Sequence, residues 1–168
     1  AQDQAAIEAV EAARKAQKTS LWLTVATMTI TLAVVTWFVW YKVFRSNERR
    51  LNAQIKIPAG EYIVGEGRKV RLNEFWIDKY EVTIGQYAKF LEYLAAHPTA
   101  ETDFNHEKQP RQLDHKPEYW EIYYRNAVKG TPVHGVPMTL NSPMITVTWW
   151  DAYAYAKWRG RELPTEQE

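Results

Sequence analysis

The longest apolar run in the sequence lies near its start, over residues 21–41. The run reads LWLTVATMTITLAVVTWFVWY and contains no charged residue, proline or glycine. About 20 apolar residues, each rising about 1.5 Å along a helix, cross a hydrocarbon core about 30 Å thick. The pattern therefore predicts one transmembrane helix over residues 21–45. Aromatic side chains near both ends of the run are predicted to anchor it at the membrane–water interfaces. They are Trp22, Trp37, Trp40 and Tyr41.

A cleaved signal peptide is the alternative interpretation of this run, but its apolar core would be shorter and a small-residue cleavage site would follow. The transmembrane interpretation makes the lipid bilayer a partner of the chain. The flanking cations nearly balance and do not fix the orientation by number alone. They are Arg14, Lys15 and Lys18 before the run, and Lys42, Arg45, Arg49 and Arg50 after it. A short cationic tail favours the cytoplasmic side, so we expect the domain after the helix to be extracytoplasmic.

Small hydroxyl side chains recur at three- and four-residue spacing along this helix, which places them on one face. They are Ser20, Thr24, Thr27 and Thr31. Such a face lets a second helix approach closely and form hydrogen bonds, so it predicts packing against other transmembrane subunits. An equally good interpretation is that each hydroxyl bonds back to its own helix. The preceding residues 1–20 predict an amphipathic segment, whose apolar face holds Ile7, Val10 and Ala13.

The pattern changes after the membrane segment. Residues 46–56 are polar and basic and predict a juxtamembrane linker, and residues 57–168 predict a globular domain. Short strands are predicted over residues 61–64 and 70–77, with glycines marking the turns. The domain is therefore expected to be of the α+β class, because helical patterns follow these strands.

The first helical pattern begins with a capping box, Thr83 with Gln86, in which each side chain satisfies a backbone N–H of the other residue. Apolar residues at helical spacing follow until His97–Pro98 ends the run. Residues 98–142 are predicted to be irregular because prolines interrupt them, with one short helix starting at Pro117.

The end of the sequence carries three further signals. Residues 144–148 predict a strand, and residues 149–159 predict a helix that is apolar on nearly all sides and therefore deeply buried. Gly160 is the expected stop of that helix. Thr165 and Glu168 have the spacing of a second capping box, which predicts that a further helix begins there. We therefore expect the domain to be completed beyond Glu168, by the same chain or by another one.

Composition narrows the classes of function. A net charge of +1, from 21 basic and 20 acidic residues, leaves no electrostatic footprint for nucleic acid. The sequence contains no cysteine, so its own residues supply no disulfide, thiolate metal ligand or cysteine nucleophile. Eight Trp and ten Tyr suit a small domain with few regular elements, since each buries a large area.

Histidines and carboxylates in the irregular segment are the remaining candidates for chemistry. They are His97, His106, His115 and His134, with Asp103, Glu107 and Asp114 nearby. Imidazole and carboxylate groups bind zinc or copper, but these wide separations fit neither a helical nor a hairpin metal motif. We interpret them as solvated loop residues. No serine lies in an elbow-like turn.

Three stretches together resemble the formylglycine-generating enzyme, or sulfatase-modifying factor, family. They are Ile57–Gly65, Phe75–Thr83 with Gln86, Tyr87 and Phe90, and Val147–Tyr155 with Trp158 and Arg161–Glu166. The resemblance covers residues 57–168, the first half of the family domain. It implies a fold related to C-type lectins with little regular secondary structure. It also implies a possible activity, the oxidation of a sulfatase cysteine to formylglycine with two cysteines, copper and oxygen.

The resemblance carries over no functional residue. In the family, the catalytic cysteines and the calcium ligands follow the Leu163–Glu166 stretch, and Ala156 stands where relatives often carry a cysteine. Residues that do match, such as Glu81, Trp149 and Asp151, are interpreted as structural. No catalytic, cofactor-binding or metal-binding residue is assigned.

Three functions remain open. The first is a membrane-anchored, non-catalytic accessory or interaction subunit of a membrane complex. The second is part of a formylglycine-generating oxidase whose catalytic half lies on another segment or chain. The third is a lectin-like module that binds carbohydrate or peptide. We rank them in this order because the chain lacks cysteine and its helix offers a hydroxyl face.

Overall fold

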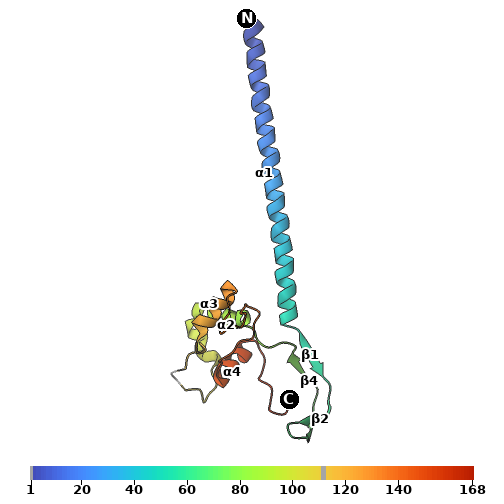
Figure 1. Ribbon diagram of the computed structural model, residues 1–168, viewed down its shortest axis with the longest axis vertical. Coiled ribbons are helices and arrows are strands. Elements are labelled where there is room, and N and C mark those ends of the chain that lie inside the picture. Colours follow the sequence, from blue (N-terminus) through green and yellow to red (C-terminus); the bar gives the residue numbers. More distant parts are fainter. Residues whose placement is uncertain (1, 111–112) are drawn as a thin grey trace. The chain divides into compact units, whose positions relative to one another are not determined.

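The structure is a computed structural model that describes residues 2–110 and 113–168. The side chains of residues 2–10, 12 and 101 are not described, so the predicted apolar face of Ile7 and Val10 lies outside the described residues. The chain divides into two compact units at Arg50 and Leu51 (Figure 1). It combines helices and strands, as the α+β prediction requires.

Helix α1 (Gln2–Leu51) accounts for the first unit. Its segment Ala13–Leu51 is long and apolar enough to cross a membrane, and a signal sequence near an N-terminus has the same properties. One uninterrupted helix passes through the predicted boundaries at residues 20/21 and 45/46. The predicted linker over residues 46–56 differs from the structure, because the helix continues to Leu51 and a strand begins at Gln54. Residues 46–51 lack proline and glycine and include good helix formers, so nothing in them ends the helix.

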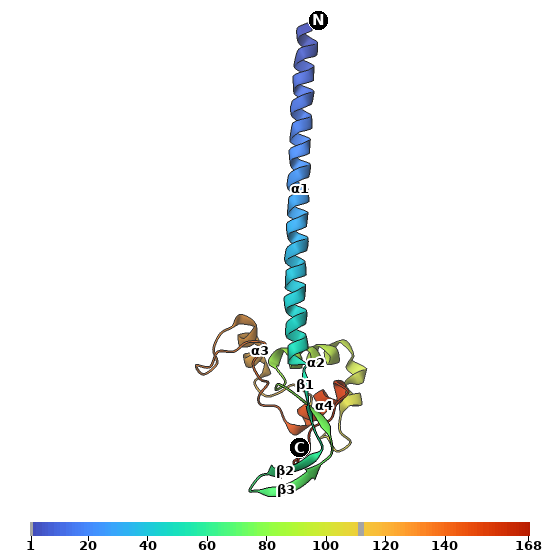
Figure 2. The same ribbon diagram turned by 90° about the vertical axis from the view of Figure 1, so that its right-hand side faces the viewer.

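Four strands open the second unit and form two antiparallel pairs, β1 with β4 and β2 with β3. They are β1 (Gln54–Ile57), β2 (Gly60–Val64), β3 (Arg68–Leu72) and β4 (Phe75–Asp78). In sequence the β2–β3 hairpin lies between β1 and β4, and in space it lies beyond the end of β1 (Figure 2). The prediction of a strand near residues 61–64 is confirmed, but the single strand predicted over 70–77 is wrong. It is broken at Asn73 and Glu74, because its first half pairs with β2 and its second half with β1.

Helix α2 (Ile84–Ala96) begins at the predicted capping box. The Gln86 N–H donates to Thr83 Oγ1 at 3.2 Å, and the Thr83 N–H donates to Gln86 Oε1 at 2.9 Å. The helix ends before His97–Pro98, as predicted. A short 3₁₀ helix, η1 (Pro98–Phe104), follows it.

Two more helices complete the unit, α3 (Trp120–Lys129) and α4 (Trp149–Trp158). The strand predicted over residues 144–148 is wrong: Met144 donates one backbone hydrogen bond to Val82, and Thr146 has φ +60°. A residue in the left-handed region cannot continue a ladder. The deep burial predicted for the last helix holds for Ala154 and Tyr155, whereas Trp149 is 53% exposed.

The core lies where α2, α3 and α4 meet, and it is largely aromatic. Tyr87 stacks on Tyr155, with ring centroids 5.5 Å apart, and Phe90 meets the same Tyr155 edge to face at 5.9 Å. Trp120 of α3 approaches Tyr87 at 6.0 Å. Offset and edge-to-face rings at these separations attract one another beyond their area burial. A few large side chains therefore hold together a unit with little regular structure.

Gly85 leaves the least room for a side chain among the described glycines. Its N–H donates to the Leu140 carbonyl oxygen at 2.8 Å, and a Cβ added there would lie 2.9 Å from that same oxygen. We expect Gly85→Ala to lower the free energy of unfolding by about 1–3 kcal/mol, because the backbone of the 139–142 turn must move. Urea unfolding of the full chain in mild detergent, followed by near-ultraviolet circular dichroism, measures this.

Gly60→Ala is the matched control, since its added Cβ meets only the Tyr62 ring at 3.5 Å. Equal stability losses for the two variants would contradict the close contact at Gly85.

Candidate functional site

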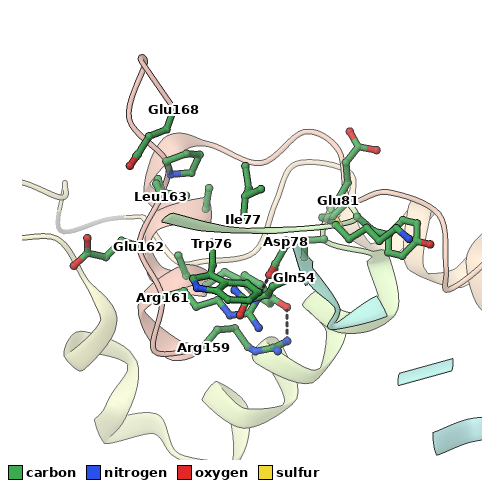
Figure 3. Close-up of a pocket in the computed structure, with 18 of the residues that line it drawn as sticks. Gln54, Trp76, Ile77, Asp78, Glu81, Arg159, Arg161, Glu162, Leu163 and Glu168 are labelled. Carbon is green, nitrogen blue, oxygen red and sulfur yellow. Dashed lines mark hydrogen bonds and ion pairs between the residues drawn. The ribbon is translucent and has the colours of Figure 1, made fainter. Parts of the chain in front are cut away.

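A cavity of about 830 Å³ opens on one side of the second unit (Figure 3). Strand β4 and the segment after it, residues 79–82, form one wall. Helix α4 and the chain that follows it, residues 159–164, form the other. Clefts of this size, lined by apolar side chains and a few polar groups, are the usual sites for ligands and binding segments. We call this cavity the β4–α4 pocket.

Most of the lining of the β4–α4 pocket is apolar. Helix α4 presents Ala152, Tyr155 and Ala156 to it, at the three- and four-residue spacing of one helix face. The small alanine side chains leave space for the cavity beside the Tyr155 ring. On the other wall, the Trp76 side chain lines the pocket and is 59% exposed. An exposed indole beside an apolar cavity is typical of a surface that another group covers.

Polar groups at one end of the β4–α4 pocket are already paired with one another. Arg161 forms an ion pair with Asp78, and Arg159 donates to the Tyr155 hydroxyl at 3.1 Å and to Asn52 Oδ1 at 2.9 Å. Burial raises the pKa of Tyr155 above its ordinary value, so this phenol stays protonated at neutral pH. The Arg161–Asp78 ion pair joins the two walls of the pocket.

The turn after α4 brings Arg161 to the pocket. Gly160 has φ +65°, and the Arg161 N–H donates to the Ala156 carbonyl at 2.9 Å. This is the left-handed C-terminal stop that the sequence predicts for Gly160. It reverses the chain so that residues 161–164 run along β4 as the second wall.

A second polar cluster lies buried beside the N-terminal end of α4. The Thr148 N–H and hydroxyl both donate to Asp151 Oδ2, at 2.7 and 2.8 Å. His115 Nε2 lies 2.6 Å from Asn105 Oδ1, and its Nδ1 lies 3.8 Å from Asp151 Oδ1. That last separation exceeds a hydrogen bond, so the attraction between the two side chains is electrostatic.

The electrostatics of this cluster favour an ionised Asp151. Burial by itself raises the pKa of the carboxyl group, whereas the Thr148 donors and the facing His115 lower it, and the net shift is downward. Tyr87 donates to the His115 carbonyl at 2.8 Å, which ties the cluster to the aromatic core. Tyr87 also lines the β4–α4 pocket, whereas His115 and Asp151 do not.

The histidines considered as metal ligands do not come together. His97 stacks on Tyr93 at 4.4 Å, and His106 packs against the aromatic rings of α4, with Tyr153 5.0 Å away. His115 lies in the buried cluster rather than in a solvated loop, which corrects the sequence interpretation for this residue. His134 sits in a turn with φ +50°. Among the side chains that the structure describes, no three from His, Asp and Glu form a metal-binding group.

The predicted packing face of α1 makes its hydrogen bonds within the helix. Each hydroxyl donates to a carbonyl three or four residues earlier, at 2.8–2.9 Å. These hydroxyls are those of Ser20, Thr24, Thr27 and Thr31. The aromatic residues predicted to lie at the membrane interfaces include Trp22, Trp37 and Trp40, which are exposed, and Tyr41, which stacks on Trp37 at 5.7 Å. Packing against a second helix stays a prediction.

The sequence interpretation did not identify the β4–α4 pocket. Trp76, Asp78 and Arg161 are brought together by the pairing of β4 and by the turn at Gly160, and they lie up to 85 residues apart in the chain. One local signal was available for the pocket, the helix stop predicted at Gly160. The Thr148–Asp151 spacing has the form of a capping box and marks the start of α4.

Comparison with known proteins gives a consistent match. Residues 41–168 match the model of the sulfatase-modifying factor enzyme 1-like domain. The chain is 33% identical over 100 residues to the uncharacterized protein YfmG of Bacillus subtilis, covering 59% of this chain and 17% of that protein. It is 26% identical to a formylglycine-generating enzyme of Streptomyces coelicolor, covering 71% of this chain and 46% of the enzyme.

A third relative is the inactive C-alpha-formylglycine-generating enzyme 2 of Mus musculus, at 29% identity over 69% of this chain and 45% of that protein. The chain thus spans less than half the length of each of these curated relatives.

Proposed function

The chain belongs to the sulfatase-modifying factor enzyme 1-like domain family, and from that premise we propose that it is a membrane-anchored, non-catalytic interaction module, an accessory subunit of a membrane complex. The β4–α4 pocket is the observation that carries this proposal. Its lining is mostly apolar, Arg161 and Asp78 pair with each other at one end, and the lining side chain of Trp76 is exposed. Such a surface is suited to binding a polypeptide segment with apolar side chains.

The absence of a thiol supports the non-catalytic half of the proposal. These 168 residues contain no cysteine, so they do not supply the thiol chemistry that the resemblance implies. The family includes both kinds of protein by name, since one mouse relative is called inactive and the Streptomyces relative is called an enzyme.

Helix α1 supports the membrane anchor. Its apolar segment is long enough to span the hydrocarbon core, and aromatic residues occupy both ends of it. In this proposal the second unit is extracytoplasmic, the N-terminal tail is cytoplasmic, and other transmembrane subunits pack against the hydroxyl face.

A second candidate, part of a formylglycine-generating oxidase, is favoured by one observation at Thr165. The Thr165 N–H donates to Glu168 Oε2 at 2.9 Å, and the Glu168 N–H donates to Thr165 Oγ1 at 3.3 Å. This formed capping box would start a helix of a completing segment. Intact-mass measurement of the native protein, with the sequence of any segment found against residues 163–168, tests this candidate. A cysteine-bearing completing segment favours the oxidase, and a completing segment without cysteine removes it.

Because the chain lacks cysteine, one introduced thiol tests whether the pocket is covered in the native particle. We expect the thiol of Val147→Cys, which lines the β4–α4 pocket, to react with maleimide at least about tenfold more slowly in native membranes than in the purified chain. The reason is that a bound segment must leave before the reagent enters.

Val128→Cys on α3 is the control, since Val128 is 57% exposed and does not line the pocket. It is expected to react equally fast in both preparations, and in intact cells with an impermeant maleimide if the domain is extracytoplasmic. Equal reaction rates of Val147→Cys in membranes and in the purified chain would contradict the interaction module.

A further inference from the structure

Three cations form a row along one face of α1, just after its apolar segment. Lys42, Arg45 and Arg49 are spaced three and four residues apart, which places them on the same side of the helix. All three are exposed. A rise of about 1.5 Å per residue gives the row a length of about 10 Å along the axis.

The side chains of this row point toward the apolar segment. In an α-helix the Cα–Cβ bonds tilt toward the N-terminus, so cations that follow a span reach back toward it. Lys42 Nζ lies 5.4 Å from the centre of the Phe38 ring. The Arg45 guanidinium lies 5.8 Å from the Tyr41 ring centre, and its Nη1 donates to the Tyr41 hydroxyl at 2.5 Å.

Aromatic side chains fix the depth of the row. Trp37, Trp40 and Phe44 follow the same three- and four-residue spacing on a different face of the helix, and Trp40 stacks on Phe44 at 5.4 Å. Indole rings prefer the membrane–water interface. A helix held there by its indoles places Lys42 and Arg45 at the level of the phosphate groups.

The side chains of the cations that precede the apolar segment point away from it. Arg14, Lys15 and Lys18 are also exposed and also tilt toward the N-terminus, which leads them away from a membrane that contains residues 21–41. The cations after the apolar segment therefore point toward the membrane and those before it point away, although each flank carries at least three cations.

We propose that the row of Lys42, Arg45 and Arg49 binds the phosphate groups of anionic phospholipids in the leaflet at the C-terminal end of the span. The inference rests on the proposed membrane anchoring of α1. Guanidinium and ammonium groups donate several charge-assisted hydrogen bonds to phosphate oxygens, and a row on one face engages more than one headgroup. Each cation near an anionic surface strengthens binding about fivefold, so the row contributes about 100-fold.

Native mass spectrometry of the full chain in mild detergent, titrated with phosphatidylglycerol or phosphatidylcholine, tests the proposal. We expect the triple variant Lys42→Gln, Arg45→Gln, Arg49→Gln to bind phosphatidylglycerol about 100-fold more weakly and phosphatidylcholine as before. The matched control variant, Arg14→Gln, Lys15→Gln, Lys18→Gln, is expected to stay within about twofold of the original chain, because its cations point away.

Unchanged phosphatidylglycerol binding in the first triple variant, or equal losses in both, overturns the proposal. Soluble glycerol phosphate at the same concentration is expected not to compete, and equal competition would show a site for free phosphate instead. Alkaline carbonate extraction of native membranes tests the membrane anchor separately from the lipid-binding row. A chain that is released refutes the anchor, whereas a retained chain with unchanged lipid binding refutes the lipid row alone.

Discussion

Replacing Phe90 with alanine is expected to lower the free energy of unfolding of the second unit by about 3–5 kcal/mol, the largest loss from any single substitution considered. Phe90 is completely buried. Its ring centre lies 5.4 Å from Trp158 of α4, 5.7 Å from His115 and 6.2 Å from Phe104 of η1. Removing the ring leaves a cavity at the point where three segments meet, and a small domain has little stability to spare.

Urea unfolding of the full chain in mild detergent, followed by tryptophan fluorescence, measures this loss. Trp76→Ala is the control, because its indole is 59% exposed and an even larger ring is removed there from the surface. We expect a change below about 1 kcal/mol there. If the two substitutions cost the same, the aromatic cluster is not the core.

The second large effect is expected at Asp151. Asp151→Ala removes the carboxylate that accepts both Thr148 donors and that faces the buried His115 imidazole. Losing one partner of a buried pair is strongly destabilising, and a helix cap is lost with it, so we expect a loss of about 3 kcal/mol. Asp151→Asn keeps an acceptor oxygen for the cap and is expected to lose clearly less. The same urea titration compares them.

The pH dependence of stability follows from the sign of the Asp151 shift. The pKa of this carboxyl group is lower in the folded protein than its ordinary value of 3.8, so the unfolded chain binds more protons at acidic pH. The stabilisation is therefore complete above about pH 4 and is lost as the pH falls through the folded-state pKa. Asp151→Asn should flatten this acid limb in urea titrations between pH 6 and 2. An unchanged acid limb would show that other carboxyl groups control it.

Local signals in the sequence predicted local structure well. The Thr83–Gln86 box, the end of α2 at His97–Pro98 and the stop at Gly160 depend on residues within one turn of each other, so spacing alone identifies them. The family resemblance of residues 57–168 is confirmed by the match over residues 41–168. The apolar run predicted a helix, but apolarity does not distinguish a span from a signal sequence.

Structure that depends on distant pairing was not predictable. Residues 70–77 have the composition of one strand, and only the competing partners β1 and β2 divide them. Residues 144–148 look like a strand, but Pro143 lacks an N–H and Thr146 adopts a left-handed conformation. His115 was interpreted as a solvated loop residue because nothing nearby in the sequence shows that Asn105 and Asp151 face it in the fold.

The insertion of the β2–β3 hairpin between β1 and β4 has a consequence for the order of folding. Pairing β1 with β4 first would require closing a loop of all the residues between Ile57 and Phe75, at an entropic cost. The hairpin has its own short turn at residues 65–67 and pairs Gly60 with Leu72. Once it forms, only Pro58–Ala59 and Asn73–Glu74 remain to be ordered, so the outer strands meet almost as neighbours. The formed hairpin thus lowers the entropic cost of pairing β1 with β4.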